Sequence, residues 1–110
     1  MGRSSRDKGA RGEREIRDLL RRAGFRCDRD GTEHGDLRHD CINIHFEVKR
    51  QETISIDEWW RQATRDAGAR NPVVFFRKNH QRWRAVIDAE FLLELLANQR
   101  TGRIIHGDAV

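Results

Sequence analysis

The chain has 110 residues, a length that fits one domain with a single hydrophobic core. Hydrophobic and charged residues each make up 36% of it, and the formal net charge is +4. No apolar run approaches the ~18 residues of a membrane span, and the charged N-terminus excludes a secretory signal, so we expect a cytoplasmic protein without a membrane partner. Cys27 and Cys41 show no paired spacing and are expected to be reduced.

Positive charge is concentrated at the N-terminus. Residues 1–26 hold nine Arg or Lys against four Asp or Glu. Such an excess suits a polyanion, most simply a nucleic acid backbone, although a solvated helix face gives the same pattern. We expect residues 1–8 to form a flexible basic arm and residues 9–100 a single domain, while residues 101–110 give no clear signal.

A first helix is predicted from about Ala10 to Ala23. Its apolar residues recur at i, i+3, i+4 and i+7, which is the pattern of one buried stripe: Ile16, Leu19, Leu20 and Ala23. Gly24 is expected to end the helix, because glycine readily adopts the left-handed conformation that is common just after a helix. Glu13 and Glu15 flank the two edges of the stripe, and spacing does not choose which of them reaches a site.

Three strands are predicted next, at residues 25–29, at a brief segment opened by Asp36 after the polar loop 30–35, and at residues 41–50. The third strand has two different faces, because successive side chains alternate. One face is apolar: Ile42, Ile44, Phe46 and Val48. The other is polar: Asn43, His45, Glu47 and Lys49.

The remaining chain predicts a helix from Asp57, as its N-cap, to Ala67, closed by Gly68. A strand at 73–76 is apolar throughout, which is typical of burial on both faces. A turn at 79–80 leads to a strand at 82–87. Asp88 then caps a helix to about Asn98, whose expected buried stripe is Phe91, Leu92, Leu95 and Leu96. The order αβββαββα predicts an α/β fold, with a central mixed sheet flanked by helices.

Two carboxylates and a lysine at one end of a sheet are the parts of a magnesium-dependent phosphodiesterase. Asp36, Glu47 and the Val48 carbonyl offer the oxygen ligands that Mg²⁺ prefers, and Mn²⁺ is expected to substitute. Lys49 shares the face of Glu47 and could stabilise developing negative charge. Glu-x-Lys alone is most often a solvated strand face. The apolar opposite face, the Asp after a glycine loop and the preceding helix with its glutamates favour the catalytic interpretation.

The sequence also resembles a family. Residues 8–16, Lys-Gly-Ala-Arg-Gly-Glu-Arg-Glu-Ile, with Leu19-Leu20 and Gly24-Phe25, resemble the first helix of the archaeal-type Holliday junction resolvases. Gly35-Asp36-Leu37 and Phe46-Glu47-Val48-Lys49 are similar to the two active-site motifs of the PD-(D/E)XK nuclease superfamily. The resemblance covers roughly residues 8–78, and phage and prophage proteins of this length share the layout. The chain differs in its shorter, acidic loop before Asp36 and in the segment after Arg50.

This resemblance implies a restriction-endonuclease-like core, divalent-metal dependence, a homodimer and no nucleotide cofactor. It assigns Glu13 to the metal site, directly or through water, with Asp36 and Glu47 as ligands and Lys49 as the catalytic lysine. The expected DNA-binding residues are basic: Lys8, Arg11, Arg14, Arg29 and Arg50. The host would be a bacterial or phage-infected cell.

Other residues have weaker signals. Gln62 on the second helix and His45 are possible neighbours of the site, and an exposed helix face explains Gln62 as well. Trp59 and Trp60 cannot share one helix face, so we expect one in the core and the other in a dimer contact. The spacing of His34, His39, Cys41 and His45 fits no closed tetrahedral zinc site, and zinc is not expected there.

The leading hypothesis is therefore a metal-dependent endonuclease that cuts branched DNA as a Holliday junction resolvase, in DNA recombination or repair. A nuclease of the same fold acting on flaps, nicked ends or linear duplex is the first alternative. A DNA-binding module without catalysis is the second, and it would bind with a steep salt dependence and cut nothing.

Overall fold

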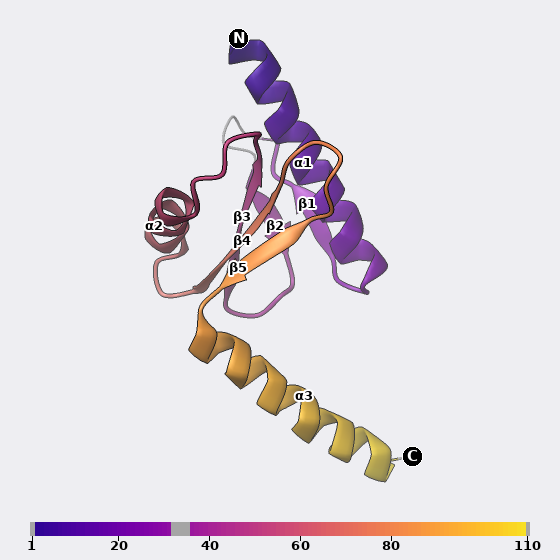
Figure 1. The fold of residues 1–110 in the computed structure, drawn as a ribbon. Helices are drawn as coiled ribbons and strands as arrows, with labels where there is room; N and C mark the ends of the chain where they lie inside the picture. Colours follow the sequence, from indigo (N-terminus) through magenta and orange to yellow (C-terminus); the bar gives the residue numbers. More distant parts are fainter. Residues whose placement is uncertain (1, 32–35, 110) are drawn as a thin grey trace.

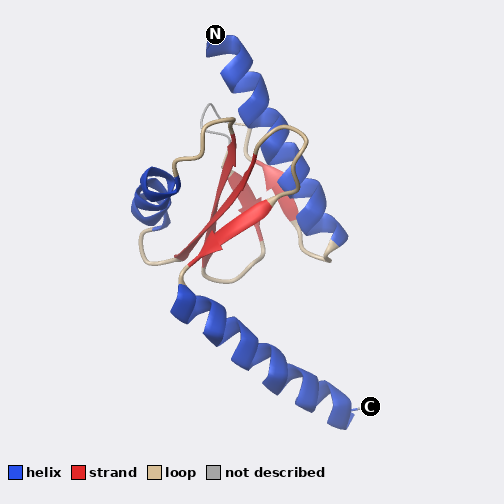
Figure 2. Cartoon of the chain, viewed as in Figure 1, coloured by secondary structure: helices blue, strands red, loops and turns tan. Residues whose placement is uncertain are grey.

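The computed structural model describes residues 2–31 and 36–109, with side chains described for 7–31 and 36–100. Over these residues the elements follow the predicted order (Figures 1 and 2). The helices are α1 (Gly2–Arg22), α2 (Ile56–Ala67) and α3 (Ala89–Ala109). The strands are β1 (Cys27–Arg29), β2 (Leu37–His39), β3 (Ile44–Arg50), β4 (Asn71–Arg77) and β5 (Arg84–Ile87). His34 and Gly35, from the polar loop, lie outside the described residues.

The main sheet is mixed and has the strand order β3-β4-β5. β3 runs parallel to β4, and α2 makes the crossover between them, whereas β5 is antiparallel to β4. β1 and β2 pair with each other as an antiparallel ribbon. The predicted α/β class, with a mixed sheet and flanking helices, is confirmed. The register places Glu47 beside Val74 and Arg50 beside Arg77, so β3 and β4 end together.

The sheet lies between α1 and α2 (Figure 1). On the α1 side, the core contains buried side chains from five elements: Ile16, Leu20, Cys27, Phe46, Val73 and Phe91. On the α2 side it contains Trp59, Ala63, Val74 and Phe76. Adjacent residues of β4 enter different clusters because strand side chains alternate. This confirms that β4 is buried on both faces, and it places Trp59 in the core, with Trp60 partly buried beside it.

The two-faced character of β3 is confirmed from Ile44 onward. Ile44, Phe46 and Val48 join the α1-side core, which leaves the polar face of the strand toward α2. The expectation for Ile42 is wrong. Asn43 has a positive φ of 60°, which is a turn conformation that asparagine tolerates, and Ile42 is 90% exposed in that turn.

Several helix boundaries also differ from the predictions. α1 begins at Gly2, so residues 2–8, which we expected to form a flexible basic arm, are helical. The apolar stripe set the predicted start, but helix hydrogen bonds are local, and a charged sequence can extend a helix into solvent. Ser55, not Asp57, occupies the N-cap position of α2. Asp88 does cap α3, since its carboxylate accepts a hydrogen bond from the Phe91 amide at 3.0 Å.

α3 extends to Ala109 and projects away from the rest of the molecule (Figure 1). Only Phe91 of its predicted stripe is buried, and the expected burial of Leu92, Leu95 and Leu96 is wrong. With Leu93, these side chains are 39–63% exposed and form one broad apolar face. Amphipathic spacing predicts that a face is apolar, but not that the same chain covers it. Within the described residues, no helix has the length and apolar character that a bilayer crossing needs.

Candidate active site

The polar face of β3 meets the inner side of α2. Lys49 donates from Nζ to Oε1 of Gln62 at 2.9 Å, and Gln62 donates from Nε2 to Oε1 of Glu47 at 3.3 Å. Lys49 Nζ lies 3.7 Å from the same glutamate oxygen. The amide of Gln62 therefore links the acid and the ammonium and keeps both oriented. Sequence reasoning left Gln62 open between this role and an exposed helix face; the structure places its amide in contact with Glu47 and Lys49.

The carboxylate of Glu47 is largely buried, with its side chain 15% exposed. Its second oxygen, Oε2, lies 3.2 Å from Nε2 of His45. An ionised carboxylate only accepts hydrogen bonds, so the imidazole donates. Burial by itself raises the pKa of Glu47, but the hydrogen bond from His45 and the charge of Lys49 outweigh burial. The pKa of Glu47 lies below its ordinary 4.5, and the group is a carboxylate at neutral pH.

Glu13 of α1 and Arg29 of β1 form a second group. Their closest side-chain atoms, Oε1 of Glu13 and NH2 of Arg29, lie 3.0 Å apart. Burial raises the pKa of Glu13 above 4.5, while Arg29 opposes that rise. Asp36 lies on this side of the site, and its negative charge also raises the pKa of Glu13. Asp36 itself is exposed and immediately precedes β2.

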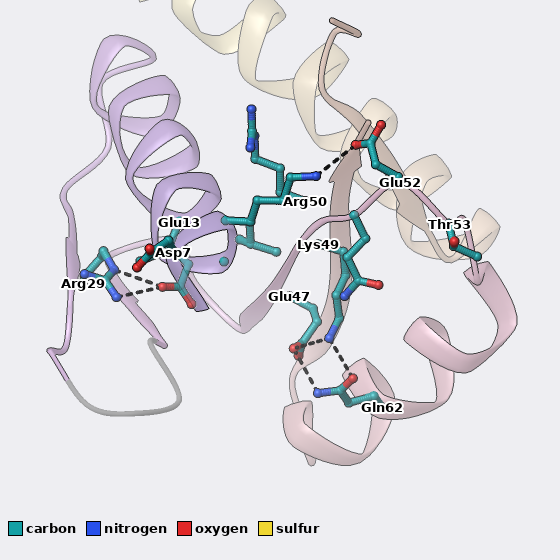
Figure 3. A pocket seen from close by; sticks show the side chains of 14 residues that line it. Asp7, Glu13, Arg29, Glu47, Lys49, Arg50, Glu52, Thr53 and Gln62 are labelled. Carbon is teal, nitrogen blue, oxygen red and sulfur yellow. Dashed lines mark hydrogen bonds and ion pairs between the residues drawn. The ribbon is translucent and has the colours of Figure 1, made fainter. Parts of the chain in front are cut away.

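A pocket of about 900 Å³ joins the two groups at the carboxyl end of β3. Figure 3 shows Glu13 and Arg29 on one side of it and Glu47, Lys49 and Gln62 on the other. The ends of parallel strands are where open α/β sheets usually bind their ligands. Asp36 does not line this pocket as the described residues form it.

Glu15 lies outside this pocket, on the opposite edge of the α1 stripe. Its carboxylate contacts Arg50 Nε at 3.3 Å, Arg77 NH1 at 3.1 Å and the indole Nε1 of Trp83 at 3.0 Å. The structure thus separates the two glutamates that spacing could not separate. Glu13 lines the pocket, and Glu15 ties α1 to the ends of β3 and β4.

The basic residues expected to bind DNA differ in their surroundings. Arg11 and Arg14 are exposed on α1. Lys8 lines the pocket and lies 3.5 Å from Glu52. Arg50 also borders the pocket, but its side chain is only 9% exposed and is held by Glu15. In this arrangement Arg50 supports the end of β3 and offers little surface to a ligand.

The chain is similar to several known proteins. Residues 4–108 match the family described as "Phage putative PDDEXK endonuclease". The chain belongs to this family. It is 30% identical to Protein D14 of Escherichia phage T5 over 119 aligned positions, which cover 81% of this chain and 74% of that protein. Its fold is similar to that of Hjc from Archaeoglobus fulgidus, a Holliday junction resolvase from an archaeal hyperthermophile. That comparison has a TM-score of 0.50 and 26% identity, and covers 73% of this chain and 72% of the other.

Membership of this endonuclease family confirms the superfamily and the restriction-endonuclease-like class predicted from the motifs. The donor atoms around the pocket fit a hard divalent cation. Glu13 and Glu47 bring carboxylate oxygens into one pocket, Val48 lines it between Glu47 and Lys49, and Asp36 adds charge on the Glu13 side. Oxygen donors of this kind are those that Mg²⁺ prefers.

One neighbour of Glu47 was missed from the sequence. Ligand atoms of His45, Glu47 and Asp66 all lie within 4.8 Å of one another. Asp66 is one helical turn after Gln62 on α2, so both project toward β3. Only this i, i+4 relation could have indicated Asp66, and it requires knowing which face of α2 covers the strand.

Proposed function

We propose that this protein is a divalent-metal-dependent DNA endonuclease that cuts branched DNA, most simply a four-way Holliday junction. The observation that carries the proposal is the arrangement of Glu47, Lys49 and Gln62 across one pocket from Glu13. An enzyme of this family cuts nucleic acid, and the likeness to an archaeal resolvase favours the junction as its substrate. DNA recombination or repair in the cytoplasm of a bacterial or phage-infected cell is the matching role.

The charges in the pocket suit phosphodiester hydrolysis. A bound Mg²⁺ or Mn²⁺ would be held by Asp36, Glu47 and the Val48 carbonyl, with Glu13 nearby, and would neutralise charge at the scissile phosphate and acidify water. The ammonium of Lys49 is aimed by Gln62 and can donate to a phosphate oxygen as negative charge develops. Without Gln62, Lys49 could collapse onto Glu47, to which it already lies within ion-pair distance.

Exposed basic residues on α1 extend the positive surface away from the pocket. Arg11 and Arg14 carry charges that a duplex backbone would meet beside the site. Phosphate contacts of this kind position a duplex without reading its sequence. Recognition of the branch would then depend on how two active sites are spaced.

A homodimer would supply those two sites. The exposed leucines of α3 support it, because a second copy of the same apolar face would remove all of them from water. Two-fold symmetry would place one cut on each of two opposed strands. Leu92→Asp and Leu96→Asp are expected to give a monomer by sedimentation or light scattering, whereas Glu94→Gln, an exposed change on the same helix, should leave the dimer intact. A monomeric wild-type protein would contradict this part of the proposal.

The substrate is tested by comparing a four-way junction, a flap and a linear duplex in Mg²⁺. We expect paired, symmetric nicks only in the junction, and loss of cutting with retained junction binding in Asp36→Asn. Equal cutting of linear duplex would refute the junction assignment and favour a general nuclease of this fold. Binding without cutting, in Mg²⁺ and in Mn²⁺, would favour a non-catalytic DNA-binding module.

A further inference from the structure

Glu47 has a second polar neighbourhood that the pocket does not use. Its Oε1 faces Lys49 and Gln62, which line the pocket, while its Oε2 faces His45, which does not. Asp66, also outside the pocket lining, lies close to both His45 and Glu47. The glutamate therefore lies between two groups of side chains, one at the end of the strand and one a step back along it.

We propose that His45, Glu47 and Asp66 form a second site, which shares Glu47 with the pocket, for a divalent cation that prefers imidazole, such as Zn²⁺. The set of one imidazole and two carboxylates is typical of three-ligand sites with an open position for water. Mg²⁺ has little preference for nitrogen, so this site would select a different ion from the one in the pocket.

The geometry is near that of a bound ion. The three ligand atoms lie within 4.8 Å of one another. Two ligands bonded to one Zn²⁺ at ~2.1 Å can be at most ~4.2 Å apart, so a small side-chain movement closes the site. His45 and Glu47 are two residues apart on one face of β3, and Asp66 comes from a helix packed on that face. Two rigid elements thus provide all three ligands.

Burial and charge also favour a cation here. The side chain of His45 is only 9% exposed, and its Nε2 points at the carboxylate of Glu47. Glu47 is a carboxylate there, and an oxygen of Asp66 lies within 4.8 Å of its ligand atom. A dication would neutralise the charge of Glu47, and the exposed position of Asp66 gives it a path from solvent.

Arg70 opposes this binding and gives the proposal a distinctive test. Its NH2 lies 3.5 Å from Nδ1 of His45, and arginine only donates, so without a cation the imidazole proton sits on Nε2. Coordination through Nε2 moves that proton to Nδ1, where the guanidinium must withdraw. Arg70 is exposed and otherwise bonded to the carbonyls of Asp66 and Ala67, so it can move.

The test is calorimetric titration of the full, untagged chain with ZnCl₂ in the absence of DNA. We expect one Zn²⁺ per chain. Asp66→Asn and His45→Gln should each bind it at least about tenfold more weakly, because mutating even a residue that only hydrogen-bonds to a metal ligand typically weakens metal binding by about that much. Glutamine at position 45 can still donate to Glu47, which keeps the hydrogen bond while removing the imidazole. Asp57→Asn, an exposed change on the same helix, is the matched control.

Arg70→Met should bind Zn²⁺ more tightly than wild type. In this variant no guanidinium faces Nδ1 of His45, which carries the proton when Nε2 binds the cation. Unchanged Zn²⁺ affinity in both Asp66→Asn and His45→Gln would overturn the site, as would the absence of stoichiometric binding to the wild type. Weaker binding in Arg70→Met would refute the proton-position argument. Because no cleavage is measured, these outcomes are independent of whether the protein cuts junctions.

Discussion

The two glutamates of α1 should respond in opposite ways to the same chemical change. The carboxylate of Glu15 contacts the guanidinium groups of Arg50 and Arg77 and accepts a hydrogen bond from the indole of Trp83. The side chain of Arg50 is only 9% exposed. Removing one partner of a buried ion pair costs about 3–5 kcal/mol, because it leaves a buried charge unpaired. Glu15 is itself 31% exposed, and glutamine retains one acceptor, so we expect Glu15→Gln to lose about 2–3 kcal/mol of stability.

Glu13→Gln should leave stability within about 1 kcal/mol of wild type. Burial raises the folded-state pKa of Glu13, so the charged form costs folding free energy at every pH above that value. Glutamine removes this cost and also loses the ion pair with Arg29, whose side chain is 25% exposed and can be solvated. The two effects oppose each other, and the variant should instead lose DNA cleavage.

Urea unfolding and junction cleavage, measured on both variants, separate the roles. With an m-value of about 1–2 kcal/mol/M, Glu15→Gln should unfold at a urea concentration about 1–3 M lower than wild type, yet cut DNA where it is folded. Equal unfolding midpoints for the two variants would refute the structural role of Glu15. Cleavage by Glu13→Gln at the wild-type rate would refute the placement of Glu13 in the site.

Three further predictions concern packing, catalysis and pH. A Cβ at Gly12 would lie 3.0 Å from Cβ of Arg50, so Gly12→Ala should lower the free energy of unfolding by about 1–2 kcal/mol. A Cβ at Gly9 would meet nothing within 4 Å, so Gly9→Ala should raise the free energy of unfolding by about 0.5–1 kcal/mol. Thermal or urea unfolding measures both, and the reverse order would contradict the close approach of α1 and β3. Gln62→Ala should reduce the single-turnover cleavage rate by about 10–100-fold with unchanged stability, and an unchanged rate would remove Gln62 from the site. Burial lowers the pKa of His39 below 6.5, so stability should fall as pH falls through 6.5 toward the folded-state value, and a flatter stability–pH profile in His39→Gln would confirm the source.

The sequence could predict what depends on local periodicity. Alternation along β3 gave both faces of the strand from Ile44 onward, and the continuous apolar run of β4 indicated burial on both sides. Asp88 and Gly68 were correctly placed at helix ends, because capping chemistry acts within a few residues. The predicted burial of Ile42 was wrong because alternation cannot show that the chain turns at Asn43, before the strand begins.

What could not be predicted depends on contacts between distant segments. Glu13 and Glu15 stand equally near the α1 stripe, and only the positions of Arg29 and Arg50 show which one faces the pocket. Asp66 is 19 positions from Glu47 and reaches it only because α2 packs on β3. The leucines of α3 have the spacing of a buried face, but their exposure is decided by the surroundings and not by their own sequence.

The most direct measurement is cleavage of a four-way junction in Mg²⁺ by wild type and Glu47→Gln, with junction binding measured in parallel and Glu58→Gln, an exposed change on α2, as the control. Wild type and the control should introduce paired symmetric nicks, while Glu47→Gln should bind the junction and leave it intact. Cutting by Glu47→Gln at the wild-type rate would show that β3 does not carry the active site.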